Sequence, residues 1–147
     1  MIPRIRKIVL KNEHVKMMLE ETHRAYPQEA CGIILGQFES DAAIAQEVVF
    51  TKNIAESSVR FVVDAEELYR ILVRAEDEGM DMVGIFHSHP TTAKPSGVDQ
   101  PFMEVNPVVW VILGTLSEGI DMSAYQWFEN AIYPVEIVIE NLKDIRK

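Results

Sequence analysis

The chain has a single cysteine, Cys31, among its 147 residues, and it has no long apolar run. One cysteine cannot form an intrachain disulfide or supply a zinc site built on paired cysteines. A membrane-spanning helix needs roughly 18 or more apolar residues in succession, and no stretch approaches that length. The apolar run near the N-terminus is interrupted by Lys7 and ends at Leu10, too short for the core of a signal peptide. These absences predict a protein of a reducing compartment, cytoplasmic by default, with no membrane partner.

Positive charge is also scarce. The chain has 14 lysines and arginines against 23 aspartates and glutamates, which gives a formal net charge of −9. Nucleic acids and anionic membrane surfaces are bound chiefly through clustered positive charge. The balance of charge therefore argues against nucleic acid as a partner. No glycine-rich loop of the kind that binds phosphates or dinucleotides is present.

The spacing of apolar residues predicts a mixed α/β fold. Helical periodicity marks 12–26 and 65–78, and a short helix is expected within 101–107. Apolar runs of strand length predict a β-sheet. These runs cover 4–10, 30–38, 42–53, 59–63, 80–89, 108–114, 122–129 and 135–140. The order of elements predicts a mixed β-sheet flanked by helices, and the length predicts one domain over 1–147.

Two of the four histidines stand in GIFHSHP, residues 84–90. In a strand the side chains of His87 and His89 point to the same face, with their backbones roughly 6.5–7 Å apart, so both rings can reach one metal ion. Ser88, between them, faces the other way. An isolated H-x-H is more often the polar end of a strand. The apolar residues before His87 predict a buried strand, however, and buried imidazoles need partners.

Asp99 is a candidate third ligand, because the loop after the second histidine is long enough to bring its carboxylate back to the strand end. Two histidines and one carboxylate leave a fourth tetrahedral position open, as in catalytic zinc sites. A helix cap is the alternative, since Ser96 and Asp99 have the spacing of a capping box. Pro101 argues against a helix that begins at Gly97, but Asp99 can also cap a helix that begins at Pro101.

A hydrolytic metal site further needs a group that takes a proton from water and delivers it to the leaving group, usually a glutamate. The spacing alone does not distinguish Glu29, Glu104 and Glu118.

The remaining candidate residues receive structural interpretations. His14 and His23, in the first predicted helix, are expected to face solvent. Cys31 is expected to be a small buried residue rather than a nucleophile, because the sequence suggests no group that would activate it.

Together these motifs resemble the JAMM, or MPN-plus, zinc metalloproteases. The pattern of that family is an early glutamate, then H-[ST]-H-P, a loop and S-x-x-D. The chain supplies these elements as PQEACGIILG, GIFHSHP and PSGVD. The order of elements over about residues 5–140 is similar to that of the family. The resemblance implies the JAMM/MPN fold, which is cytidine-deaminase-like, as a single catalytic domain over 1–147.

The resemblance also implies a role for each motif residue. His87, His89 and Asp99 would bind one catalytic Zn²⁺ with a water in the open position. Glu29 would activate that water and then protonate the leaving amine, and Ser96 would hydrogen-bond the developing oxyanion. The family usually has seven residues between the second histidine and the serine, whereas PTTAKP supplies six. This shorter loop bears mainly on the position of Ser96.

The implied function is a zinc-dependent isopeptidase that removes ubiquitin or ubiquitin-like modifiers, with a diglycine C-terminus, from lysines or fusion precursors. A protease that trims a sulfur-carrier ubiquitin-like protein shares every catalytic residue and stays an alternative. A non-catalytic MPN scaffold is disfavoured because all three ligands and the glutamate are present. A zinc nucleoside deaminase is excluded because its P-C-x-x-C signature needs two cysteines.

The resemblance extends to partners. Association with a proteasome, or a homodimer, is compatible with this family. The segment 56–63 is the expected sheet edge along which the tail of a modifier would add as a strand.

Overall fold

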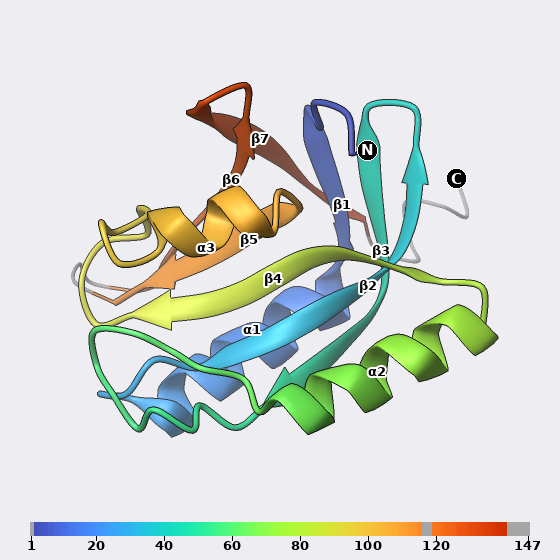
Figure 1. Ribbon diagram of the computed structural model, residues 1–147. Coiled ribbons are helices and arrows are strands. Elements are labelled where there is room, and N and C mark those ends of the chain that lie inside the picture. Colours follow the sequence, from blue (N-terminus) through green and yellow to red (C-terminus); the bar gives the residue numbers. More distant parts are fainter. Residues whose placement is uncertain (1, 116–118, 141–147) are drawn as a thin grey trace.

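A computed structural model describes residues 2–115 and 119–140 of the chain. Within these ranges the chain forms seven strands and three helices (Figure 1). In chain order they are β1 (Lys7–Lys11), α1 (Asn12–Ala25), β2 (Cys31–Glu39), β3 (Ala42–Thr51), α2 (Ala65–Asp77), β4 (Asp81–His89), α3 (Gln100–Val105), β5 (Val109–Gly114), β6 (Asp121–Phe128) and β7 (Ala131–Glu140). No helix of the described residues is long and apolar enough to cross a membrane.

The strands form one closed barrel in the order β1-β3-β2-β4-β5-β6-β7. The pairs β1–β3, β1–β7 and β4–β5 are parallel, and the other neighbours are antiparallel. The predicted mixed sheet with interspersed helices is therefore confirmed. Closure into a barrel was not predicted, because it depends on β1 pairing with β7, a strand more than 100 residues further along the chain.

The helices cover different sides of the sheet. Figure 1 shows α1 on the far side and α2 and α3 on the near side. Met18 of α1 belongs to one buried hydrophobic cluster, with Phe86 and Leu113 of the sheet. Ile71 of α2 and Met103 of α3 belong to a second cluster on the other side. Burial on both faces explains why the central strands have nearly continuous apolar sequences.

The strand predicted at 59–63 is wrong, and so is the sheet edge expected at 56–63, because no strand lies between β3 and α2. The segment pairs with no strand of the described residues, and the Asn53 side chain holds the loop in which it lies. Asn53 Oδ1 accepts hydrogen bonds from the amides of Ala55 and Val62, at 3.1 and 3.0 Å. Its Nδ2 donates to the carbonyls of Glu29 and Arg60, at 3.0 and 3.1 Å. The apolar sequence VRFVV resembles a strand, but the buried amide side chain of Asn53 binds two of its backbone groups, the Arg60 carbonyl and the Val62 amide.

We expect Asn53→Ala to lower the free energy of unfolding by about 1–3 kcal/mol, because several buried backbone groups lose their hydrogen-bond partner. Chemical denaturation measures the change. Asn106→Ala is the matched control, since Asn106 Nδ2 makes an exposed hydrogen bond to the Phe102 carbonyl. Equal stabilities for the two variants would contradict this account of the loop.

One histidine also differs from expectation. His14 is buried, not exposed to solvent, and its Nδ1 accepts a hydrogen bond from the Lys11 amide at 3.2 Å. It thereby satisfies a free amide at the start of α1. Burial lowers the pKa of His14.

His23, on the exposed side of the same helix, faces solvent as predicted. Cys31 is buried, also as predicted, and burial raises the pKa of its thiol to about 11.

Candidate metal centre

The two histidines of β4 lie at the end of a strand that is hydrogen-bonded on both sides. β4 pairs with β2 and β5, and the residues from Val83 to His89 are buried. As the strand periodicity predicted, His87 and His89 point to the same side, and their Nε2 atoms lie 3.0 Å apart. The fold therefore places two ring nitrogens side by side in a buried position.

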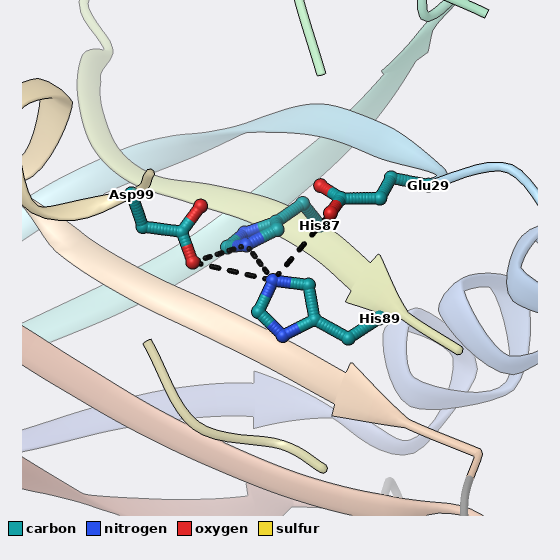
Figure 2. A group of neighbouring side chains, drawn as sticks. All are labelled: Glu29, His87, His89 and Asp99. Carbon is teal, nitrogen blue, oxygen red and sulfur yellow. Dashed lines mark hydrogen bonds and ion pairs between the residues drawn. The ribbon is translucent and has the colours of Figure 1, made fainter. Parts of the chain in front are cut away.

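Asp99 reaches the histidines from the loop before α3. Its Oδ2 lies 3.2 Å from the Nε2 atom of His87 and 3.2 Å from that of His89 (Figure 2). With the 3.0 Å between the two nitrogens, these atoms form a nearly equilateral triangle. Ligand atoms bound tetrahedrally to zinc at about 2.0–2.1 Å lie about 3.3 Å from one another. The triangle therefore has nearly the dimensions of three ligands of one tetrahedral ion.

The hydrogen bonds of the histidines also suit a metal. His89 Nδ1 lies 3.2 Å from the Thr92 carbonyl, which can only accept, so Nδ1 carries the proton and Nε2 of a neutral ring has a free lone pair. Burial lowers the pKa of His87, and a neutral ring is the form that binds metal. His87 Nδ1 is a buried atom without a hydrogen-bond partner in the described part of the chain. When both rings are neutral with the proton on Nδ1, their Nε2 lone pairs point at one another and at a carboxylate, and a shared cation would stabilise this arrangement.

Asp99 is held as a carboxylate. Burial by itself would raise its pKa, but without a metal, hydrogen bonds from Nε2–H groups of His87 and His89 and from the Ser96 amide hold the pKa of Asp99 well below its usual range. Conversely, burial would lower the pKa of His89, and the hydrogen bond and negative charge of Asp99 raise it overall. An ionised carboxylate beside two imidazoles supplies one negative charge and three donor atoms for a cation.

Glu29 lies beside this triangle, two residues before β2 begins. Its side chain is 1% exposed, and its Oε2 is 3.7 Å from His89 Nε2. Its Oε1 has no hydrogen-bond partner among the described residues. Burial, and to a smaller extent the charge of Asp99, raise the pKa of Glu29 to about 7, against the opposing effect of His89. A carboxyl group with this pKa can both accept and release a proton near neutral pH.

The structure thus brings together four of the five residues that the family resemblance singled out. One ligand atom from each of Glu29, His87, His89 and Asp99 lies within 4.8 Å of all the others. Glu104, which spacing could not distinguish from Glu29, is exposed on α3. Glu118 lies outside the described residues.

Ser96, the fifth residue, is joined to Asp99 by reciprocal hydrogen bonds. The Ser96 amide donates to Asp99 Oδ2 at 2.9 Å, and the Asp99 amide donates to Ser96 Oγ at 3.2 Å. These are the two hydrogen bonds of the capping box that the spacing suggested, but they span the turn before α3, which begins at Gln100, and the Asp99 side chain makes no cap hydrogen bond to α3. The expectation that Asp99 caps this helix is therefore wrong, and the Ser96 amide instead holds the carboxylate oxygen that lies beside the histidines.

Two aromatic residues that carry no sequence motif enclose His87. The Phe61 ring stacks on the imidazole at a centroid distance of 4.8 Å, and Trp110 meets it edge to face at 5.6 Å. Phe61 comes from the loop held by Asn53, and Trp110 comes from β5. Together they help to keep water from the ring, and no local sequence signal could have identified them.

Gly114 at the end of β5 supports the loop that leads to Asp99. It pairs with His89, and a Cβ atom at position 114 would lie 2.4 Å from the Ala93 nitrogen and 2.6 Å from the Thr91 oxygen.

We expect Gly114→Ala to displace this loop and weaken metal binding at least about 10-fold, as loss of supporting contacts around metal ligands does. Competition with a chelating dye measures the affinity. Gly97→Ala is the control, since a Cβ there meets nothing within 4 Å, and equal affinities would refute the prediction.

Comparisons with known proteins cover most of the chain. Residues 11–128 match the Prok-JAB family, the prokaryotic homologs of the JAB domain. The chain is 37% identical over 114 residues to the desampylase of Pyrococcus furiosus, covering 76% of each chain. It is 26% identical over 135 residues to the CysO-cysteine peptidase of Mycobacterium tuberculosis, covering 89% of this chain and 91% of the other. The solution structure of protein DSY2949 from Desulfitobacterium hafniense superposes with a TM-score of 0.81 at 25% identity, covering 91% and 93% of the two chains.

Proposed function

The chain belongs to the family of prokaryotic homologs of the JAB domain and has the JAMM/MPN fold, and from this premise we propose that it is a metal-dependent isopeptidase for ubiquitin-like modifiers. The observation that carries the proposal is the triangle formed by His87 Nε2, His89 Nε2 and Asp99 Oδ2, with the buried carboxyl group of Glu29 beside it. We further propose that 1–147 is a single catalytic domain.

We infer that the metal is zinc, held by His87, His89 and Asp99. Two imidazole nitrogens and one carboxylate oxygen are ordinary zinc ligands, and three protein ligands leave a position open for water. When bound, zinc would polarise the scissile carbonyl and lower the pKa of a water to about 7. The buried, negatively charged donor set described above supports this choice.

Glu29 would act as the general base and then as the general acid. It would accept a proton from the water that attacks the amide carbonyl, and it would return that proton to the leaving nitrogen as the C–N bond breaks. Burial, which raises the pKa of Glu29 to about 7 in the metal-free site, supports both steps, because it brings the pKa of the carboxyl group toward neutral pH.

Ser96 would donate a hydrogen bond to the oxyanion that develops on the substrate carbonyl. Its Oγ accepts from the Asp99 amide, so its own O–H hydrogen is free to donate. The same hydrogen bonds support a fixed position for Ser96 close to the ligands, even though the loop is one residue shorter than usual in the family.

The names of the relatives suggest the substrates. Relatives in Pyrococcus furiosus and Haloferax volcanii are desampylases, and the mycobacterial relative is a CysO-cysteine peptidase. We propose that this chain cleaves after the diglycine of a ubiquitin-like modifier joined to a lysine or to a fusion partner, with a sulfur-carrier protein as the alternative substrate. A cytoplasmic location, association with a proteasome and homodimerisation stay predictions.

The test is to incubate the zinc-loaded protein with the ubiquitin-like proteins of its host, each prepared as a linear fusion, a lysine isopeptide conjugate and a C-terminal cysteine adduct. We expect cleavage after the diglycine that stops when a chelator removes the metal and returns when zinc is restored. The preferred adduct separates the two substrate classes. Bound zinc without cleavage of any substrate would favour the non-catalytic scaffold.

A further inference from the structure

Ser88 stands between the two histidines, yet it has no part in the metal centre. It is buried, and strand alternation directs its side chain away from the rings. Its Oγ accepts a hydrogen bond from the Ala30 amide at 2.8 Å. Ala30 directly follows Glu29 in the chain. β4, which carries His87 and His89, is therefore hydrogen-bonded to the residue next to the proposed acid/base.

This contact lies where β2 and β4 separate. Their last regular pair is Cys31 opposite His87, and the next pair would be Ala30 opposite Ser88. In a regular antiparallel pair, two such residues exchange two backbone hydrogen bonds. Here the Ser88 amide donates to the Ala30 carbonyl at 3.0 Å, but the Ala30 amide donates to the Ser88 hydroxyl. The hydroxyl thus takes the place of a backbone carbonyl at the position where the chain leaves the sheet toward Glu29.

The loop after β3 also holds the backbone of Glu29. Its amide donates to the Ser57 carbonyl at 2.8 Å, and its carbonyl accepts from Asn53 Nδ2 at 3.0 Å. Both partners belong to the loop after β3. Without the Ser88 hydroxyl, this loop would still hold Glu29. Ala30 would, however, keep only one of its two hydrogen bonds to Ser88 of β4.

We propose that Ser88 is a positioning residue for Glu29. The Ser88 hydroxyl sets the distance between the Glu29 carboxyl group and the two histidine ligands, which lie beside Ser88 on β4. The proposal rests on the proposed function, because it assigns Ser88 to the reaction in which Glu29 takes part. It also gives a physical reason for a hydroxyl at the middle position of the H-[ST]-H pattern. Serine and threonine are the side chains that carry an oxygen acceptor on Cβ.

Threonine and valine at position 88 make the decisive comparison, because they have nearly the same shape and only threonine has the oxygen. Ser88→Thr is expected to retain the kcat of the parent. Ser88→Val and Ser88→Ala are expected to lower kcat about 10-fold to 100-fold, since a misplacement of about 1 Å can reduce a rate about 100-fold. KM and bound metal are expected to stay unchanged in all three variants.

Val83→Ala controls for general destabilisation, because Val83 is a buried core residue of the same strand. It is expected to lower the melting temperature without changing kcat at a temperature where all variants are folded. Three results would overturn the proposal. They are equal kcat for Ser88→Val and Ser88→Thr, a metal affinity that falls in proportion to kcat, and an equal loss of kcat in Val83→Ala.

A second measurement does not depend on catalysis. Hydrogen exchange of the Ala30 amide, followed by NMR in the zinc-loaded protein, is expected to be faster in Ser88→Val than in Ser88→Thr, because only valine leaves this amide without an acceptor. If the parent cleaves no substrate, the proposed function fails and exchange still tests the contact. Equal exchange rates in the two variants would overturn the positioning role whatever the activity.

Discussion

Replacing Glu29 with glutamine is expected to reduce kcat by about 10²–10⁴-fold while one zinc ion stays bound per chain. General acid–base catalysis contributes about that factor, and glutamine has nearly the shape of glutamate but cannot take up the proton of the attacking water. The carboxyl group lies beside the ligand triangle, with Oε2 3.7 Å from His89 Nε2, compared with 3.0–3.2 Å within the triangle. Removing its charge should therefore leave the ligand set intact.

The measurement is steady-state cleavage of a modifier conjugate, together with the zinc content of the same samples. Glu104→Gln is the matched control, because the sequence alone could not distinguish Glu104 from Glu29, and its side chain is exposed on α3. This variant is expected to behave as the parent does. If Glu29→Gln turned over as fast as the parent with zinc bound, the acid/base role would belong to another group.

The second large effect is expected at His89. We expect His89→Ala to lower zinc affinity by more than about 100-fold, because loss of even an outer hydrogen-bond partner of a ligand can cost 10–100-fold and this change removes the ligand itself. Asp99 and His87 would then be left as two ligands of an incomplete site. Cleavage should be lost together with the metal.

Equilibrium dialysis with zinc measures this loss, and thermal unfolding gives an independent measurement. A metal that binds only the folded chain raises its melting temperature. A chelator should therefore lower the melting temperature of the zinc-loaded parent and leave that of His89→Ala unchanged. His23→Ala, an exposed histidine on α1, is the control. Stoichiometric zinc in His89→Ala would contradict the assigned ligand set.

The site shows where sequence patterns succeed. His87 and His89 share a face because strand periodicity is a local property, and their Nε2 atoms indeed meet at 3.0 Å. The spacing of Ser96 and Asp99 predicted reciprocal hydrogen bonds between them, and these are present, although they close the turn before α3 rather than cap the helix. In both cases the interacting residues lie close together in the chain, so backbone geometry alone determines how they meet.

Sequence patterns fail where a distant side chain competes with a local preference. The strand expected at 59–63 is a loop because Asn53 binds its backbone. His14 was expected to face solvent, but it is buried near β3, where the Gln46 backbone also affects its pKa. In both cases the local sequence contains no sign of the neighbour that decides the outcome.

The sequence by itself therefore determined the helices, most of the strands, and the shared direction of the two histidines. The tertiary structure decided three further points. It placed Glu29 rather than Glu104 beside the histidines, it brought Phe61 against His87, and it joined Ser88 to Ala30 across 58 residues. The physical reason is that periodicity and capping act over a few residues along the chain, whereas pairing of β2 with β4 and burial in a common core act between segments that only the folded barrel brings together.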